Sequence, residues 1–249
     1  FEEETLSNEE IRDGMRKSAR DQTLKSVPVF VTSATHNIGT IPLMEALVAY
    51  TSSPEGRRIQ VLRGESEELE ALDLPHTDDN PLVAYTFKTI NDKYVGTLNY
   101  IRIFSGKISA NDQCYNVTSE ETERFNSLLT IRGKETEPIP VLHAGDIGVV
   151  AKLGDTKTGD TFAAKGAPIT VPMPHFPDPL FMVAVNPRTQ ADSAKMGMML
   201  SSLSAADPTL RWRQDSDTRE TVLEGMGEVH VSLAVSRAER LGVGIDTKM

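Results

Sequence analysis

Ser33, Ala34 and Thr35 are the first residues in the chain whose types and position suggest chemistry. They follow an apolar run, 27–31, and precede a helical pattern that begins near residue 42. Small side chains in such a loop let main-chain N–H groups approach a planar ligand closely, and binding residues concentrate in loops of this kind. Because Ser-Ala pairs are common, an ordinary surface turn is the alternative interpretation.

Four arginines form a second candidate site. Arg211 and Arg213 lie on one face of a predicted strand, whereas Arg237 and Arg240 lie near the end of a predicted helix. Guanidinium groups placed in this way can contact the phosphates of a nucleic acid. The alternative is an ordinary surface on which Asp and Glu balance the positive charge.

Catalytic and metal-binding patterns are absent from the sequence. It contains no Gly-x-x-x-x-Gly-Lys-Ser/Thr phosphate loop, no Gly-x-Gly-x-x-Gly fingerprint and no Gly-x-Ser-x-Gly elbow. Its five histidines, at positions 36, 76, 143, 175 and 230, lack the spacing of a zinc site. For His230, packing in the fold is favoured over a metal or acid–base role. We therefore predict no catalytic residue and no metal ligand in this chain.

The single cysteine, Cys114, excludes an internal disulfide and is typical of a reducing, cytoplasmic environment. It lies in a predicted strand, 113–117, which favours a small buried hydrophobic residue over a catalytic thiol.

The net charge of −10 is concentrated in residues 1–80, which hold 8 basic and 16 acidic residues. The remaining two thirds are close to neutral, so a basic face for RNA is compatible with the composition. No apolar run reaches the length of a membrane span. The sequence starts at Phe1 inside an acidic helical pattern, and we expect it to be a fragment of a longer protein.

The elements that position the candidate residues fall into four segments. Residues 1–54 contain a helix over 8–20 behind a capping box at Ser7, a buried strand over 27–31 and a helix over 42–50, with Leu43, Leu47 and Tyr50 facing inward. This order is typical of the end of an α/β domain. Residues 55–80 are rich in Pro, Gly and acidic side chains, which indicates an acidic linker.

Residues 81–175 change to short, regularly spaced strands, for which a small antiparallel β-barrel is the natural closure. The predicted strands are 83–90, 97–104, 113–117, 125–131, 138–142 and 147–152.

Residues 176–249 predict the order βαββαβ, the ferredoxin-like split arrangement. Thr189 caps the first helix, in which Ala194, Met198 and Leu203 are expected on the buried face. The second helix starts after Gly225-Met226-Gly227, where the hydrophobic period changes from that of a strand to that of a helix. We expect Gly225 and Gly227 to form a tight structural turn that needs positive φ.

Several segments in this order resemble elongation factor G. Residues 27–50, VPVFVTSATHNIGTIPLMEALVAY, look like the end of its G domain, with Ser33, Ala34 and Thr35 at the guanine-recognition loop. The segments LVAYTFKTINDKYVGTLNYIRIFSG, HAGDIGVV and KTGDTF resemble its β-barrel domain II. The segments DPTL and LEGMGEVHVSL resemble domain III.

The resemblance implies a cytoplasmic translational GTPase that uses GTP to drive a step of elongation on the ribosome, usually translocation. Its barrel would dock on the RNA and proteins of the small ribosomal subunit, and domain III would couple the parent's own G domain to the other domains. No membrane or DNA partner is implied. GTP and Mg²⁺ would belong to the full-length parent, because this chain lacks the phosphate loop, the switch regions and the Asn-Lys-x-Asp motif.

The signature helix departs from the family pattern at three positions. Val229 and Val231 replace the usual leucines, and Ser232 stands where an acidic residue is common. Gln190, earlier in the chain, replaces a frequent lysine. The parent is therefore the main translocase, a ribosomal-protection factor or another elongation-factor-G-like paralogue. A non-catalytic module that binds RNA or protein is a further alternative, whereas a free-standing enzyme finds no support in the residues.

Overall fold

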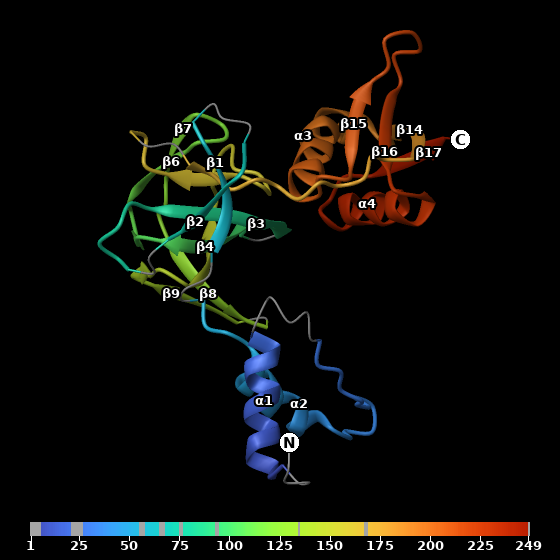
Figure 1. Ribbon diagram of the computed structural model, residues 1–249. Helices are drawn as coiled ribbons and strands as arrows, with labels where there is room; N and C mark the ends of the chain where they lie inside the picture. The colour runs from blue at the N-terminus through green and yellow to red at the C-terminus, as the bar shows by residue number, and fades with distance from the viewer. Residues whose placement is uncertain are drawn as a thin grey trace. The chain divides into compact units, whose positions relative to one another are not determined.

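The structure, a computed structural model, describes residues 6–20, 27–54, 58–64, 68–74, 77–92, 95–133, 135–166 and 169–248 (Figure 1). It divides into two compact units, Phe1–Glu55 and Gly56–Met249.

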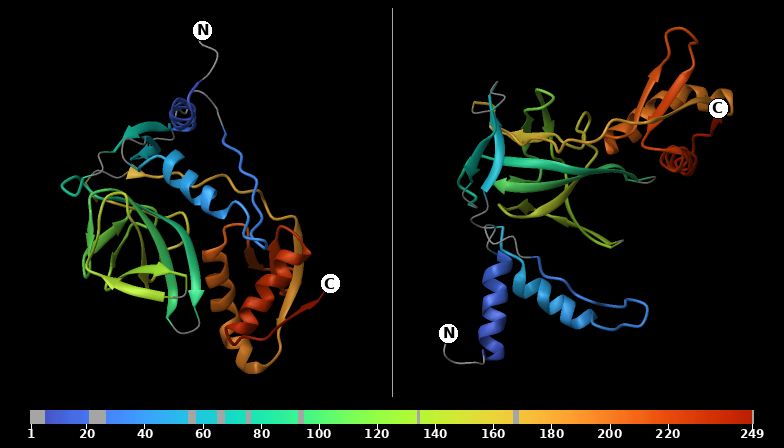
Figure 2. Two further views of the ribbon diagram at one scale, coloured as in Figure 1. Left: turned by 90° about the horizontal axis from the view of Figure 1, so that it is seen from below. Right: turned by 45° about the vertical axis from the view of Figure 1, so that its right-hand side comes forward.

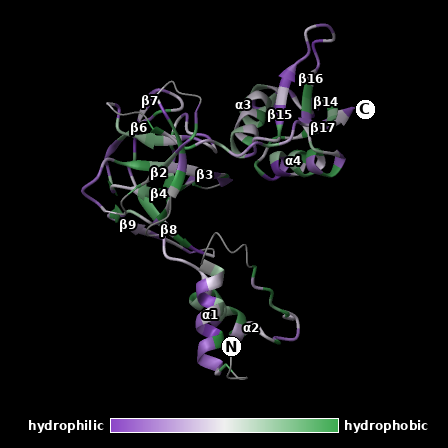
Figure 3. Cartoon of the chain, in the orientation of Figure 1, coloured by the Kyte–Doolittle hydropathy of each residue, from purple (hydrophilic) through white to green (hydrophobic). Residues whose placement is uncertain are grey.

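The first unit contains the two helices α1 (Asn8–Arg20) and α2 (Thr40–Tyr50). The capping box at the start of α1 is confirmed: the Ser7 main-chain N–H donates to the Glu10 carboxylate at 2.8 Å, and the Glu10 N–H donates to Ser7 Oγ at 3.3 Å. Figure 3 shows that α1 is mostly hydrophilic. In α2, by contrast, most apolar side chains are exposed and only Ala46 is buried. Of the residues predicted to face inward, Leu43 and Tyr50 are partly buried, and Tyr50 stacks on Phe30, whereas Leu47 is 54% exposed.

The prediction of a buried strand over 27–31 is wrong. These residues are outside any strand, and Val27, Val29 and Val31 are each at least 80% exposed. A strand needs a neighbour for its main-chain N–H and C=O groups, and among the described residues none pairs with this run. The nearest pairing is an isolated bridge between Ser33 and Ile38.

Residues 83–163 of the second unit build an eight-stranded antiparallel sheet that curves into a barrel, as predicted (Figure 2, left). Its strand order is β7-β6-β12-β3-β4-β11-β8-β9, and a separate pair, β10-β5, lies within the same stretch of sequence. The bounds are β3 Val83–Asp92, β4 Gly96–Ser105, β5 Ile108–Ser109, β6 Gln113–Asn116, β7 Glu121–Arg124, β8 Leu128–Arg132, β9 Glu135–Ile139, β10 Val141–Leu142, β11 Ile147–Ala151 and β12 Thr161–Ala163.

Alternation along these strands fills the barrel with apolar side chains. Ile101 and Ile103 of β4 are fully buried inside, whereas Arg102 between them is only partly buried. Phe125 and Phe162 meet edge to face with ring centroids 4.9 Å apart, and both are fully buried. Cys114 belongs to the same core, which confirms its prediction as a buried hydrophobic residue.

The acidic segment 55–80 is not a simple linker. Strands β1 (Arg58–Arg63) and β2 (Glu70–Asp73) pair as an antiparallel hairpin, and β13 (Ile169–Thr170) adds to β1 as a third strand. Val61 in β1 is fully buried, so the hairpin has a packed face despite its charge. The acidic side chains of Glu68 and Glu70, by contrast, are exposed.

Residues 181–248 form the predicted βαββαβ domain. Its elements are β14 (Phe181–Pro187), α3 (Gln190–Ala206), β15 (Arg211–Gln214), β16 (Thr221–Gly225), α4 (Glu228–Arg240) and β17 (Ile245–Lys248). The sheet order is β15-β16-β14-β17, with every neighbouring pair antiparallel. Val183 and Val185, on one face of β14, share a core with residues of both helices, so α3 and α4 cover the same face of the sheet. This is the ferredoxin-like arrangement.

The start of α3 and the burial of Leu203 are predicted correctly, but the burial of Ala194 and Met198 is not. Thr189 caps the helix in a capping box with Asp192. The residues that pack into the core are Met196, Leu200 and Leu203, whereas Ala194 is exposed and Met198 is 71% exposed. Apolar residues occur almost all round this helix, so periodicity leaves its buried face ambiguous.

Candidate functional site

The turn between β16 and α4 falls at the predicted glycine pair, but for a different reason. Neither Gly225 nor Gly227 has a positive φ in the left-handed region, and the φ of Gly227 is 175°, which any residue adopts. What Gly225 provides is space. A Cβ atom there would lie 2.9 Å from Val231 Cγ2 and 3.1 Å from His230 Nδ1. Gly227 has no atom within 4 Å of such a position. Only the first glycine is therefore required, because α4 packs closely against the end of β16.

His230 connects this turn to the end of α3. Its Nδ1 accepts a hydrogen bond from the Met226 N–H at 3.1 Å, and its Nε2 lies 3.1 Å from Asp207 Oδ2. The neutral tautomer with the proton on Nε2 satisfies both contacts. Burial alone would raise the pKa of Asp207, but hydrogen bonds from Thr209 and the nearby His230 bring it below its usual value. His230 is thus a packed, hydrogen-bonded histidine that joins two turns.

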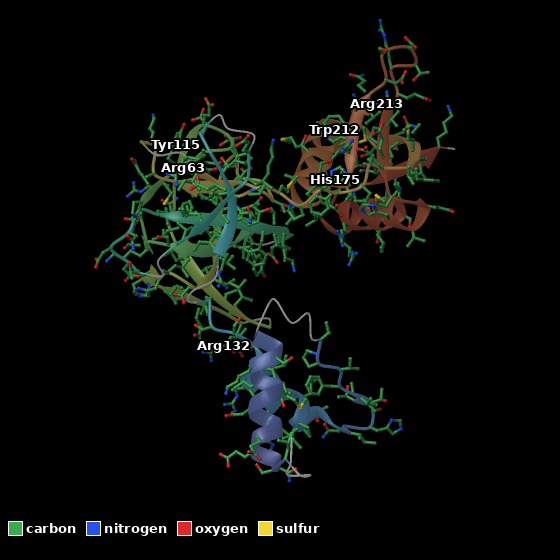
Figure 4. All side chains as sticks on the ribbon, viewed as in Figure 1. Arg63, Tyr115, Arg132, His175, Trp212 and Arg213 are labelled. Atoms are coloured by element: carbon green, nitrogen blue, oxygen red, sulfur yellow. The ribbon has the colours of Figure 1, made fainter. Side chains whose placement is uncertain are left out.

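Two of the four candidate arginines are engaged in ion pairs. Arg211 lies 3.0 Å from Asp178. Arg213, labelled with its neighbour Trp212 in Figure 4, binds both Asp215 and Glu224 at 2.9 Å. The two carboxylates raise the pKa of the Arg213 guanidinium. On β15 the alternative of a charge-balanced surface therefore describes the structure better.

The other two arginines, on α4, have no carboxylate partner among the residues the structure describes. Arg240 donates from Nε to the Ser236 carbonyl at 3.3 Å, and the side chain of Arg237 has no hydrogen bond within the described chain. Both are exposed, and both line a groove of about 480 Å³ that Lys88 of β3 also borders. The structure thus divides the four arginines into a neutralised pair and a free pair.

The loop of Ser33, Ala34 and Thr35 is a tight turn rather than an open one. Ser33 exchanges main-chain hydrogen bonds with Ile38 at 3.0 Å in both directions. The side chains of Ser33 and Thr35 lie 3.0 and 3.2 Å from His36 Nδ1. The N–H groups of Ala34 and Thr35 make no hydrogen bond within the described residues, and these three residues are mostly exposed.

Main-chain N–H groups without a partner are available to donate to a planar ligand, so the loop is compatible with the guanine-binding role that the family resemblance implies for it. These donors would contact only one edge of the nucleotide. Hydroxyl groups and main-chain donors at this loop supply neither a phosphate cradle nor a carboxylate ligand for Mg²⁺. Across the described ranges, no group of three or more His, Cys, Asp or Glu side chains could hold a metal ion.

The remaining candidates have structural roles. Burial, and to a lesser extent Asp112, raises the pKa of the Cys114 thiol to about 12, which leaves it unreactive at neutral pH. His143 pairs with Asp78 at 2.7 Å, and His36 belongs to the Ser33 turn. His76 lies outside the described residues.

No helix in the described part of the chain is both long and apolar enough to cross a bilayer.

Known proteins match both domains of the second unit. A family model described as elongation factor G domain 2 matches residues 81–165, and one described as Elongation Factor G, domain III matches residues 176–249. A crystal structure of a protein from Thermus thermophilus aligns with a TM-score of 0.75 and 25% sequence identity. That alignment covers 98% of this chain and 34% of the other, so the chain spans about a third of its length. The chain belongs to the elongation factor G family and carries its second and third domains.

Proposed function

We propose that this chain is the central part of a ribosome-associated translational GTPase that acts in polypeptide elongation, by GTP-dependent translocation in the cytoplasm. The observation that carries the proposal is the succession of an elongation factor G domain 2 and domain III in one chain, in that order. The barrel would contact the RNA and proteins of the small ribosomal subunit. The α/β domain would couple the G domain to those contacts, since a small module between connectors suits a rigid-body movement.

The first unit supports a G domain in cis. Its helix α2 exposes Ile41, Met44 and Val48, each more than 60% accessible, beside a cavity of about 650 Å³. An apolar helix face of this kind is stabilised when further parts of a domain cover it. GTP and Mg²⁺ would bind to that G domain, and Ser33, Ala34 and Thr35 would contribute only the guanine edge.

The free arginines support a contact with ribosomal RNA. Arg237 and Arg240 carry no countercharge among the described residues, so they can neutralise phosphates without first breaking an ion pair. Arg211 and Arg213 would have to give up Asp178, Asp215 and Glu224. We therefore assign RNA contact to the pair on α4 in preference to the pair on β15.

Co-sedimentation of the full-length protein with ribosomes tests the proposal. Binding is expected in the presence of a non-hydrolysable GTP analogue, and failure to bind with or without nucleotide would overturn it. The double variant Arg237→Gln/Arg240→Gln should bind more weakly and with a smaller dependence on salt, by about one unit of slope for each lost phosphate contact. The matched double variant Arg211→Gln/Arg213→Gln should bind as the wild type does.

A paralogue of the translocase, such as a ribosomal-protection factor, is the second candidate. It is favoured by Ser232, which is exposed on α4 and donates its hydroxyl back to the Val229 carbonyl at 2.9 Å. This position therefore presents no charge to a partner, in contrast to the acidic residue common in the family. Translocation assays with the full-length protein distinguish the two, because a protection factor would bind ribosomes without promoting translocation.

A further inference from the structure

The C-terminal end of α3 accepts hydrogen bonds from the barrel. A helix leaves its last four carbonyls without intrahelical donors. In α3 the Leu203 carbonyl is satisfied locally, by the Asp207 N–H at 3.0 Å. Two others of these four, the Ala205 and Ala206 carbonyls, accept from a residue of the barrel domain. The Ser202 carbonyl, one position earlier, accepts from the barrel as well.

Two barrel residues provide these donors. Asn91, in β3, donates its side-chain amide to the Ser202 carbonyl at 3.0 Å. Thr158, in the loop before β12, donates its main-chain N–H to the Ala205 carbonyl at 3.2 Å and its hydroxyl to the Ala206 carbonyl at 3.5 Å. The barrel thus takes the place that a C-terminal capping motif takes in an isolated helix.

Other hydrogen bonds within the barrel hold both donors in place. Thr97 Oγ1 lies 3.4 Å from Asn91 Oδ1, which turns the amide nitrogen toward the helix. The loop of Thr158 is held by Asp160, whose buried carboxylate accepts from the Lys157 N–H at 2.9 Å and from the Asn116 amide at 2.8 Å. Fixed donors lose little conformational freedom on binding.

The contact that these bonds make lies outside the apolar cores of both domains. The apolar core of the barrel and that of the α/β domain are separate, and none of the core clusters formed by the described residues includes residues of both. Cavities of about 480 and 240 Å³ border the contact, and Asn91 lines both. Interfaces between domains that lack a large apolar area are the ones at which relative motion is expected.

We propose that Asn91, Thr158 and the C-terminal turn of α3 form a releasable latch, which holds the α/β domain on the barrel in one state and frees it in another. The connector 171–180, which contains no helix or strand, keeps the two domains joined when the latch is open. The latch goes beyond the proposed function, because it is a property of this chain in solution and requires neither ribosome nor nucleotide.

Distance measurements by pulsed electron paramagnetic resonance test the latch in the 249-residue chain. Spin labels would be attached at Glu137→Cys in the barrel and Ser216→Cys in the α/β domain, both exposed positions, while Cys114 is buried and stays unlabelled. The near-isosteric variants Asn91→Leu and Thr158→Val each remove one hydrogen bond between the two domains, so each should raise the ratio of undocked to docked molecules about two- to twelvefold. The exposed positions Asn126 and Thr136 provide matched controls, Asn126→Leu and Thr136→Val, which should leave the distance distribution unchanged.

Amide hydrogen exchange provides a second readout that separates latch opening from unfolding. The Thr158 N–H bonds across the latch to Ala205, whereas the adjacent Gly159 N–H bonds within the barrel to Thr86 at 2.8 Å. In the Asn91→Leu variant, exchange at Thr158 should accelerate while Gly159 stays protected. Equal distance distributions in the wild type and both latch variants would overturn the proposal. An equal acceleration of amide exchange at Thr158 and Gly159 would overturn it as well.

Discussion

Replacing Gly225 with alanine tests the packing of α4 on the end of β16. The new Cβ would lie 2.9 Å from Val231 Cγ2 and 3.1 Å from His230 Nδ1, closer than carbon contacts normally come. Val231 is 2% exposed and cannot move outward freely, so overpacking should cost about 1–3 kcal/mol. Displacing His230 would also weaken its bond to the Met226 N–H, for about 1 kcal/mol more. We expect Gly225→Ala to lower the free energy of unfolding by roughly 2–4 kcal/mol.

Urea unfolding followed by tryptophan fluorescence measures this change in the right domain. Trp212 is the chain's only tryptophan, and it packs against the core of the α/β domain. Gly227→Ala is the matched control, because Gly227 is extended and its Cβ position is open, so its unfolding free energy should stay within about 1 kcal/mol of the wild type. Equal destabilisation of both variants would favour a turn that needs glycine at both positions and would refute the packing argument. An unchanged Gly225→Ala variant would refute it as well.

Three further predictions concern burial and charge. Leu200→Ala should destabilise the α/β domain by about 2–5 kcal/mol, because Leu200 is fully buried. Met198 is 71% exposed, so Met198→Ala should change the stability by less than about 0.5 kcal/mol in the same urea assay. Equal effects of the two substitutions would contradict the assigned buried face of α3. Cys114 should resist iodoacetamide at pH 8 in the folded chain, because burial raises the pKa of its thiol to about 12, and it should react in guanidinium chloride. Fast reaction of the folded chain would argue against the burial of Cys114. Hydrogen bonds from the Thr218 main chain and from Arg213 lower the pKa of Asp215 from 3.8 to about 2. The contribution of the Asp215 carboxylate to stability is therefore present above pH 4 and is lost as the pH falls toward 2. The acid-induced loss of stability over this range should be smaller in Asp215→Ala, and an unchanged pH profile would count against these hydrogen bonds.

Local signals predicted the α/β domain well. The Thr189 cap and the change of period at Gly225 each depend on residues close in sequence, and both support the order βαββαβ. Why position 225 needs a glycine could not be predicted from neighbouring residues. The cause is the short distance between the end of β16 and the side chain of Val231, which depends on how α4 packs against the sheet.

Long-range pairing accounts for most of what the sequence did not predict. The strand β12 has three residues and is identified by its antiparallel neighbours β3 and β6 rather than by its own pattern. The hairpin of β1 and β2 was not predicted because the segment is rich in acidic residues, of which Glu68 and Glu70 are exposed. The run 27–31 shows the opposite case, since its apolar residues predicted a strand for which the described chain offers no neighbour.

The candidate site was located only in part. Residue types identified the four arginines, but the sequence could not separate them, because the partners Asp178, Asp215 and Glu224 depend on the fold. The donors that cap α3, Asn91 and Thr158, carried no signal at all. Each lies far from its acceptor along the chain, by 111 residues for Asn91 and by 48 for the Thr158 hydroxyl.

Ribosome-stimulated GTP hydrolysis by the full-length protein tests the central claim most directly. If this chain is the middle of an elongation-factor-G-type GTPase, the hydrolysis rate should rise strongly when ribosomes are added, and the Arg237→Gln/Arg240→Gln variant should need more ribosomes to reach the same rate. A full-length protein that hydrolyses no GTP, or hydrolyses it at the same rate with and without ribosomes, would contradict the account.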